Sequence, residues 1–88
     1  MGAQMKHVLT SVARTVQTVE IVAAAGAIRL SELSAALGTS RPGAFRIAQS
    51  LVALRWLSQG SDRRYRIGPG ARALGSVHHG DVRPSGNE

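Results

Sequence analysis

Arginine side chains recur in two short stretches of this sequence, at spacings that could place them on one surface. Arg41 and Arg46 occur with Gln49 in a segment of helical periodicity, and Arg63 and Arg64 follow in a segment rich in turn residues. Guanidinium and amide groups pair with phosphate oxygens and with the edges of DNA bases. The pattern predicts base contacts from the helix and phosphate contacts from the turn.

The charge of the whole chain points to the same class of partner. Its 88 residues contain 11 Lys and Arg against 5 Asp and Glu, which gives a net charge of +6. Such an excess in a short chain favours nucleic acid first and an anionic membrane second, although it could also serve solubility alone. No apolar run approaches the ~20 residues that span a bilayer, so we expect no membrane partner.

Catalytic and metal-binding patterns are not evident. The chain has no cysteine, which excludes disulfides and thiolate metal sites and fits a cytoplasmic protein. His78 and His79 are adjacent and cannot both aim at one ion, so with His7 they predict no metal site and no other cofactor. Five acidic residues, two of them near the C-terminus, form no paired-carboxylate arrangement. We therefore expect no enzyme.

Two helices are predicted to precede the arginine-bearing helix. A valine stripe at spacings of four, three and three predicts a first helix that Ser11 caps and Gly26 ends. The alternating segment 27–30 predicts a short strand, and Ser31 caps a predicted helix over 32–37. The stripe of the first helix comprises Val12, Val16, Val19 and Val22.

A tight turn leads into the third predicted helix, which Ser40 or Arg41 caps and which runs to about Leu54. Pro42 falls in its first turn, where the missing N–H costs nothing. Phe45 lies on the flank, at an angle that fits burial and groove contact equally well. The buried face is expected to comprise Ala44, Ile47, Ala48, Leu51 and Leu54, and the opposite face Pro42, Arg46, Gln49 and Ala53.

A hairpin is predicted after the third helix. Residues 56–59 and 64–67 alternate like strands around turn residues, and we expect Trp56 and Tyr65 to pack across the hairpin. The sequence predicts a mainly α fold with a small β-hairpin, in the order of a winged helix-turn-helix. The predicted organisation is a flexible lead-in over residues 1–9, one winged helix-turn-helix DNA-binding domain over 10–75, and a disordered tail over 76–88.

Several short pieces of the chain keep the order and spacing of one known family. Over residues 11–75 the sequence resembles the N-terminal domain of the IclR family of bacterial transcriptional regulators. The run from Arg64 through Tyr65 to Pro69 is the most specific piece. The others are Ser11-Val12-Ala13-Arg14, Leu30-Ser31-Glu32-Leu33, Leu37-Gly38, Arg46, Leu51-Val52-Ala53-Leu54 and Trp56-Leu57.

The resemblance implies sequence-specific binding of double-stranded DNA in transcriptional regulation. The third helix would read the major groove, and the basic hairpin, or wing, would lie on the backbone. Pro42 and Gly43 depart from the hydroxyl pair that the family usually has near the start of this helix. The departure favours the alternative of a protein-interaction module without specific DNA binding. The expected DNA contacts are Ser40, Arg41, Gly43, Phe45, Arg46, Gln49, Arg63 and Arg64.

The resemblance also implies partners and a place in the cell. We expect a weak homodimer, both because the first helix carries more valine than a small core needs and because the family pairs its DNA-binding domains. We expect a bacterial cytoplasmic protein that is associated with the nucleoid when bound. Family members carry a C-terminal effector-binding domain, so this chain is expected to be an excised domain or a stand-alone short protein. No small-molecule effector site is expected within it.

Overall fold

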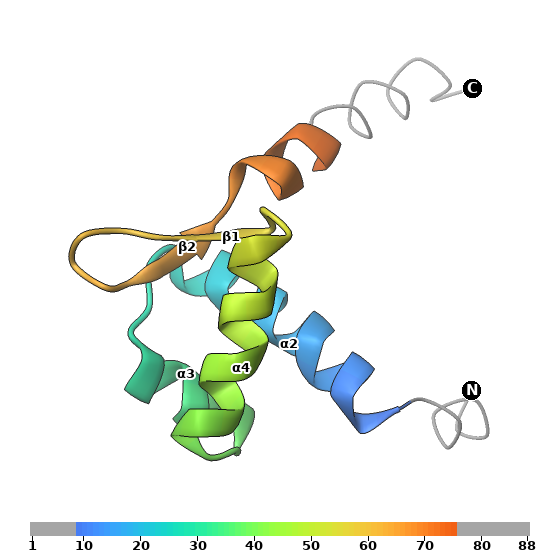
Figure 1. Ribbon diagram of the computed structural model, residues 1–88, viewed down its shortest axis with the longest axis vertical. Helices are drawn as coiled ribbons and strands as arrows, with labels where there is room; N and C mark the ends of the chain where they lie inside the picture. The colour runs from blue at the N-terminus through green and yellow to red at the C-terminus, as the bar shows by residue number, and fades with distance from the viewer. Residues whose placement is uncertain (1–8, 76–88) are drawn as a thin grey trace.

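Three helices lead into a two-stranded hairpin in the computed structural model, which describes residues 9–75 (Figure 1). The elements are α2 (Thr10–Ala25), α3 (Leu30–Leu37), α4 (Arg41–Ala53), β1 (Leu57–Gln59) and β2 (Tyr65–Ile67). A further short helix over 69–75 follows the hairpin. The predicted mainly α fold with a small hairpin is confirmed. The predicted tail and nearly all of the predicted lead-in lie outside the described residues.

Helix α2 begins earlier than predicted and buries only part of its valine stripe. Leu9, not Ser11, is the N-cap, and no side chain caps the helix. Thr18 is buried at the centre of the packed face, and its hydroxyl donates to the Arg14 carbonyl at 2.7 Å. Of the valine stripe, Val22 is fully buried, whereas Val12 and Val16 are 51% and 53% exposed.

The segment before α3 does not form the predicted strand. Ile28 makes an isolated antiparallel bridge with Tyr65, through N–H to carbonyl distances of 3.0 and 2.7 Å. The helix starts at Leu30 with Arg29, not Ser31, at the N-cap. The Glu32 carboxylate favours this start, because it accepts the N–H of the N-cap residue Arg29 at 3.0 Å, as the N3 side chain of a capping box does.

Helix α4 starts and ends as predicted. Ser40 is the N-cap, and its Oγ accepts the Gly43 N–H at 3.2 Å. Ala44, Ala48 and Leu51 are buried. Leu54 was predicted to share that face but is 68% exposed. It is the C-cap residue of α4 and borders an open apolar hollow at the end of the buried face.

The hairpin packs through one face of its strands. β1 and β2 are antiparallel, with Leu57 opposite Ile67 and Gln59 opposite Tyr65. The expectation that Trp56 packs across the hairpin with Tyr65 is wrong. Trp56 precedes β1, whereas Tyr65 is opposite Gln59 at the far end of that strand. Trp56 instead borders an apolar hollow shared with Val16 of α2.

The core lies where α2, α3, α4 and the hairpin meet. Tyr65 is the largest of its fully buried side chains, so the hairpin is part of the core and not an appendage. The other members of the buried cluster are Val22, Ile28, Leu33, Ala48, Leu51 and Leu57. Within residues 9–75, no helix has the length and apolar character needed to cross a membrane.

Candidate nucleic-acid interface

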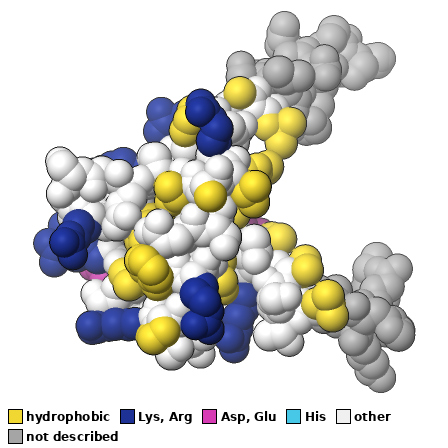
Figure 2. Space-filling model, viewed as in Figure 1, with side chains coloured by type: hydrophobic (Ala, Val, Ile, Leu, Met, Phe, Trp, Pro, Cys, Tyr) yellow, Lys and Arg dark blue, Asp and Glu magenta, His cyan; other side chains and the backbone are white. Residues whose placement is uncertain are grey.

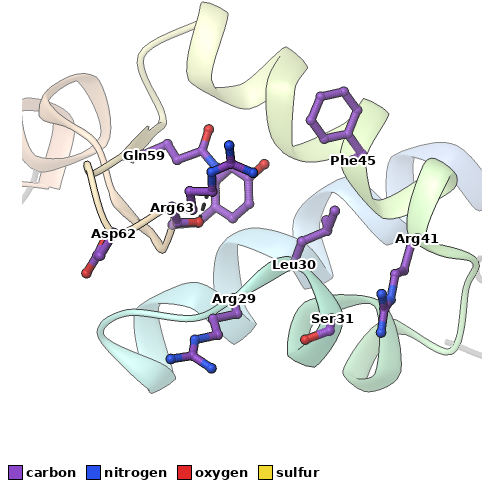
Figure 3. A pocket seen from close by; sticks show the side chains of 9 residues that line it. Arg29, Leu30, Ser31, Arg41, Phe45, Gln59, Asp62 and Arg63 are labelled. Atoms are coloured by element: carbon purple, nitrogen blue, oxygen red, sulfur yellow. Dashed lines mark hydrogen bonds between the residues drawn. The ribbon is translucent and has the colours of Figure 1, made fainter.

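Two hollows border the N-terminal part of α4. The first, of about 460 Å³, lies between α3, α4 and the wing, and three of its lining residues are Arg29, Arg41 and Arg63 (Figure 3). The second, of about 430 Å³, lies between α4 and α2, and Arg14 and Arg46 line it. The start of α4 is thus flanked by guanidinium groups from neighbouring elements.

None of these guanidinium groups pairs with an acidic side chain of the described part of the chain. Within residues 9–75 the single ion pair joins Arg66 to Asp62. Arg29, Arg41, Arg46 and Arg63 are all exposed. Figure 2 shows basic side chains along the wing and around the lower end of α4. This surface can pair with several phosphates without breaking an existing salt bridge.

The backbone at the start of α4 offers little to an anion. Pro42 has no N–H, Gly43 donates its N–H to Ser40 Oγ, and the Ala44 N–H bonds the Ser40 carbonyl at 2.9 Å. The free N–H groups of a helix N-terminus usually bind phosphate. Here the arginine side chains must supply most of that attraction.

Gly43 keeps the turn before α4 tight. A Cβ atom at Gly43 would lie 3.0 Å from Thr39 Oγ1 and 3.2 Å from Ser40 Oγ. A side chain there would therefore press on the hydroxyl that caps the helix. Ser40 thus caps α4, whereas positions 42 and 43 supply no hydroxyl group to its first turn.

Phe45 lies at the surface. Its side chain is 47% exposed and borders the hollow between α3, α4 and the wing (Figure 3). The helical angle of Phe45 was compatible with burial and with exposure, and the residue is exposed. An exposed ring beside arginines can contact the apolar edge of a base such as the thymine methyl group.

Gln49 has partners within the domain. Its Nε2 donates to Tyr65 Oη at 3.0 Å and to Gln59 Oε1 at 3.2 Å. The side chain was predicted to face away from the core towards DNA, and the structure places it, half-buried, against the base of the wing.

The wing is held by its own polar contacts. Arg66 makes a two-pronged contact with Asp62, with Nη2 to Oδ2 at 2.8 Å and Nη1 to Oδ1 at 3.1 Å. The Arg64 N–H also donates to Asp62 Oδ1, at 3.0 Å. The Arg66 hydrogen bonds first, and then the Arg64 N–H, hold the pKa of the Asp62 carboxyl well below its ordinary value. Arg66 is therefore neutralised locally, whereas Arg63 and Arg64 have no acidic partner among the described residues.

Arg29 and Arg14 also line the two hollows beside α4, although the sequence did not single them out. Arg29 precedes α3 and reaches the same hollow as Arg41. Arg14 Nη1 donates to Thr39 Oγ1 at 3.0 Å and so ties α2 to the turn before α4. Their positions in the sequence gave no signal, because only the packing of α2 and α3 brings them beside α4.

A metal centre is not evident in the described part of the chain. Residues 9–75 contain no group of three or more His, Cys, Asp or Glu side chains that could hold an ion. The three histidines considered in the sequence, His7, His78 and His79, lie outside the described residues.

Comparisons with known proteins agree with this geometry. Residues 11–61 match the sequence model of the IclR helix-turn-helix domain. Comparison with curated proteins finds no match. Among solved structures, an IclR family transcriptional regulator from Brucella abortus superposes with a TM-score of 0.74 at 20% identity, over 89% of this chain and 30% of that one.

Two further structures give the same result. A regulator of this type from Alicyclobacillus acidocaldarius has a TM-score of 0.74 at 23% identity, over 80% of this chain and 29% of its own. One from a Silicibacter species has a TM-score of 0.74 at 21% identity, over 85% of this chain and 30% of its own. At these identities the likeness concerns the fold. The chain spans about 30% of the length of each regulator.

Proposed function

The chain belongs to the IclR helix-turn-helix family, and from that premise we propose that it binds double-stranded DNA in a sequence-specific manner to regulate transcription. The observation that carries the proposal is the set of arginines on both sides of α4 that have no acidic partner among residues 9–75. A helix in the major groove has one phosphate strand on either side. Guanidiniums flanking α4 on two sides match that arrangement.

The proposed contacts divide into two kinds. The exposed side chains of α4, above all Arg46, meet base edges, because residues early in a recognition helix enter the groove most deeply. The wing arginines meet phosphates, which set position and affinity but carry little sequence information. The residues assigned to this surface are Ser40, Arg41, Gly43, Phe45, Arg46, Gln49, Arg63 and Arg64. Arg14 and Arg29 join them from α2 and α3.

Arg46→Ala is the variant that tests this assignment. Arg46 is exposed and has no place in the core, so its removal leaves the fold intact. If Arg46 reads a guanine, affinity for the selected site falls by about 1–3 kcal/mol and affinity for random duplex far less. If it binds a phosphate, affinity falls on every sequence and the salt slope drops by about one.

Fluorescence anisotropy at two salt concentrations separates these outcomes on a site selected from a random DNA pool. Arg72→Ala is the matched control, because it removes the same charge from an exposed position beyond the hairpin. Feeble wild-type binding that salt abolishes would favour a protein-interaction module. Equal binding by Arg46→Ala and wild type would contradict α4 as the reading helix.

The second partner in the proposal is another copy of this chain. Val12, Val16, Leu54 and Trp56 are large exposed hydrophobic residues, and the last three border a hollow of about 300 Å³ between α2 and the end of α4. Hydrophobic side chains over α2 are visible in Figure 2. The hollow is lined by α2 and the C-terminal part of α4, whereas Ser40 and Arg41 lie at the N-terminal end of α4, so pairing through the hollow leaves them free for DNA.

A weak dimer that tightens on a two-fold symmetric site is expected, with half-sites about one helical turn, ~34 Å, apart. Analytical ultracentrifugation with such a duplex measures the stoichiometry. A single protein chain on each duplex at saturating protein would contradict pairing. We place the protein in the bacterial cytoplasm, at the nucleoid when bound, and assign no effector-binding role to these 88 residues.

A further inference from the structure

A chain of side-chain hydrogen bonds runs from α4 to the tip of the wing. Gln49 Nε2 donates to Gln59 Oε1 at 3.2 Å, and Gln59 Nε2 donates to the Arg63 carbonyl at 3.1 Å. We infer that Gln49 is a positioning residue that fixes the wing relative to α4 and does not itself read a base. The inference rests on the proposed function and assigns a different role to one residue of that surface.

The direction of every hydrogen bond in this chain is determined. The Arg63 carbonyl can only accept, so Gln59 must turn its Nε2 towards the wing tip and its Oε1 towards α4. Gln49 must then present its Nε2 to Gln59, and the second hydrogen of that amide points to Tyr65 Oη at 3.0 Å. The arrangement leaves no donor of the Gln49 side chain unused.

This use of Nε2 conflicts with base reading. A glutamine that recognises adenine donates from Nε2 to N7 and accepts at Oε1 from the N6 amino group. Both hydrogens of the Gln49 amide are already bound within the domain, so adenine would have to compete with two existing hydrogen bonds. Gln49 is also half-buried, which limits how far its amide can turn.

The position of the chain in the fold suits a role in orienting the wing. Gln59 ends β1 and is paired with Tyr65 at the start of β2, so both strands are held at the point where the wing leaves the core. Beyond that point Arg63 adopts a left-handed φ of 66°, and its N–H bonds the Gly60 carbonyl at 2.9 Å. The bond from Gln59 to the Arg63 carbonyl links this turn to α4.

The consequence is that base reading and backbone contact are coupled. The side chains of α4 and the arginines of the wing can meet one duplex at the same time only if the angle between the two elements is fixed. Gln49 holds that angle from the helix side, and the bridge between Ile28 and Tyr65 holds β2 from the other.

The first test is made on the free protein. Gln49→Ala should increase amide hydrogen exchange of residues 60–64, because the wing loses its link to α4, while exchange in α2 stays unchanged. Gln59→Ala should have the same effect, and as an exposed position it tolerates the change if Gln49→Ala weakens the fold. Gln17→Ala, on the exposed side of α2, is the matched control. Unchanged exchange in the wing of both variants would overturn the inference.

The second test uses DNA and a double-mutant cycle. Gln49→Ala should weaken binding to selected and random duplexes alike and reduce the salt slope by about 0.9, the value for one phosphate contact. In an Arg63→Ala background it should cause little further loss, because the contact that it positions is already gone. If the affinity losses of Gln49→Ala and Arg63→Ala were additive, and the loss from Gln49→Ala occurred only on duplexes with one particular adenine, Gln49 would read that base and the inference would be refuted.

The two tests separate this inference from the proposed function. If wild type bound no DNA, the proposed function would fail, and the exchange measurement on the free protein would still decide what Gln49 does. If wild type bound DNA and Gln49→Ala changed neither wing exchange nor affinity, the inference alone would fail.

Discussion

Asp62→Asn should make the protein bind DNA more tightly. Asp62 holds both Nη atoms of Arg66 and places a negative charge on the wing. Asparagine keeps an oxygen that can accept the Arg64 N–H, which Asp62 Oδ1 now accepts at 3.0 Å, so the turn should survive. The substitution removes one repulsive charge and releases one guanidinium.

The size of the effect depends on salt. One added phosphate contact steepens the slope of log affinity against log salt by about 0.9. Between about 200 mM and about 50 mM salt, the ratio of mutant to wild-type affinity should therefore grow about 3.5-fold. Affinity for random duplex should rise in the same proportion as affinity for a selected site, because phosphate contacts carry no sequence information.

Anisotropy titrations across that salt range measure the effect. Glu20→Gln is the control, because it also raises the net charge from +6 to +7 but alters an exposed residue of α2, away from the wing. Asp62→Asn should exceed Glu20→Gln in both affinity and salt slope. Equal behaviour of the two variants would refute the argument that the wing pair restrains a DNA contact.

Three further predictions concern stability. Gly68→Ala should lower the free energy of unfolding by about 1–3 kcal/mol, because its Cβ would lie 2.7–2.8 Å from backbone atoms of Arg55 and Leu57. An unchanged urea midpoint would contradict this packing. Ser40→Ala should cost about 1 kcal/mol through loss of the α4 cap. Ser31→Ala, within α3, serves as the control, and equal losses would contradict the caps assigned. Since the folded-state pKa of Asp62 is depressed, its pair with Arg66 stabilises the fold above the ordinary aspartate pKa. That contribution should disappear as pH falls through the lowered pKa, so the free energies of unfolding of wild type and Asp62→Asn should converge in acid. A difference between them that stays constant with pH would contradict a stabilising role of the pair.

Local features were predictable because they depend on nearby residues. Hydrophobic periodicity located three helices, and Gly26 and Gly38 end two of them at positive φ, where L side chains are rarely found. Ser40 caps α4 as predicted, since its partner Gly43 is three residues away. The excess of arginine and the order of the elements were likewise present in the chain itself.

Helix starts were less predictable where two local solutions compete. Ser11 and Ser31 both have the residue type of a cap, yet Leu9 and Arg29 take those positions. At α3 the winning contact is the Glu32 carboxylate, which lies three residues beyond the cap. A hydroxyl in the sequence indicates that a helix start is near, whereas at α3 a contact from the first helical turn favours another residue as the cap.

Packing alone decided which side chains meet across elements. Periodicity placed Leu54 on the buried face of α4 and Gln49 on the exposed face, but the structure exposes Leu54 and directs Gln49 to Gln59 and Tyr65. The reason is physical: helical angle gives a direction in space, and only the neighbouring elements determine whether solvent, core or a hydrogen-bonding partner lies in that direction. Arg29 and Arg14 join the basic surface for the same reason. The sequence thus determined the elements and their charge, and the tertiary structure decided which arginines gather around α4.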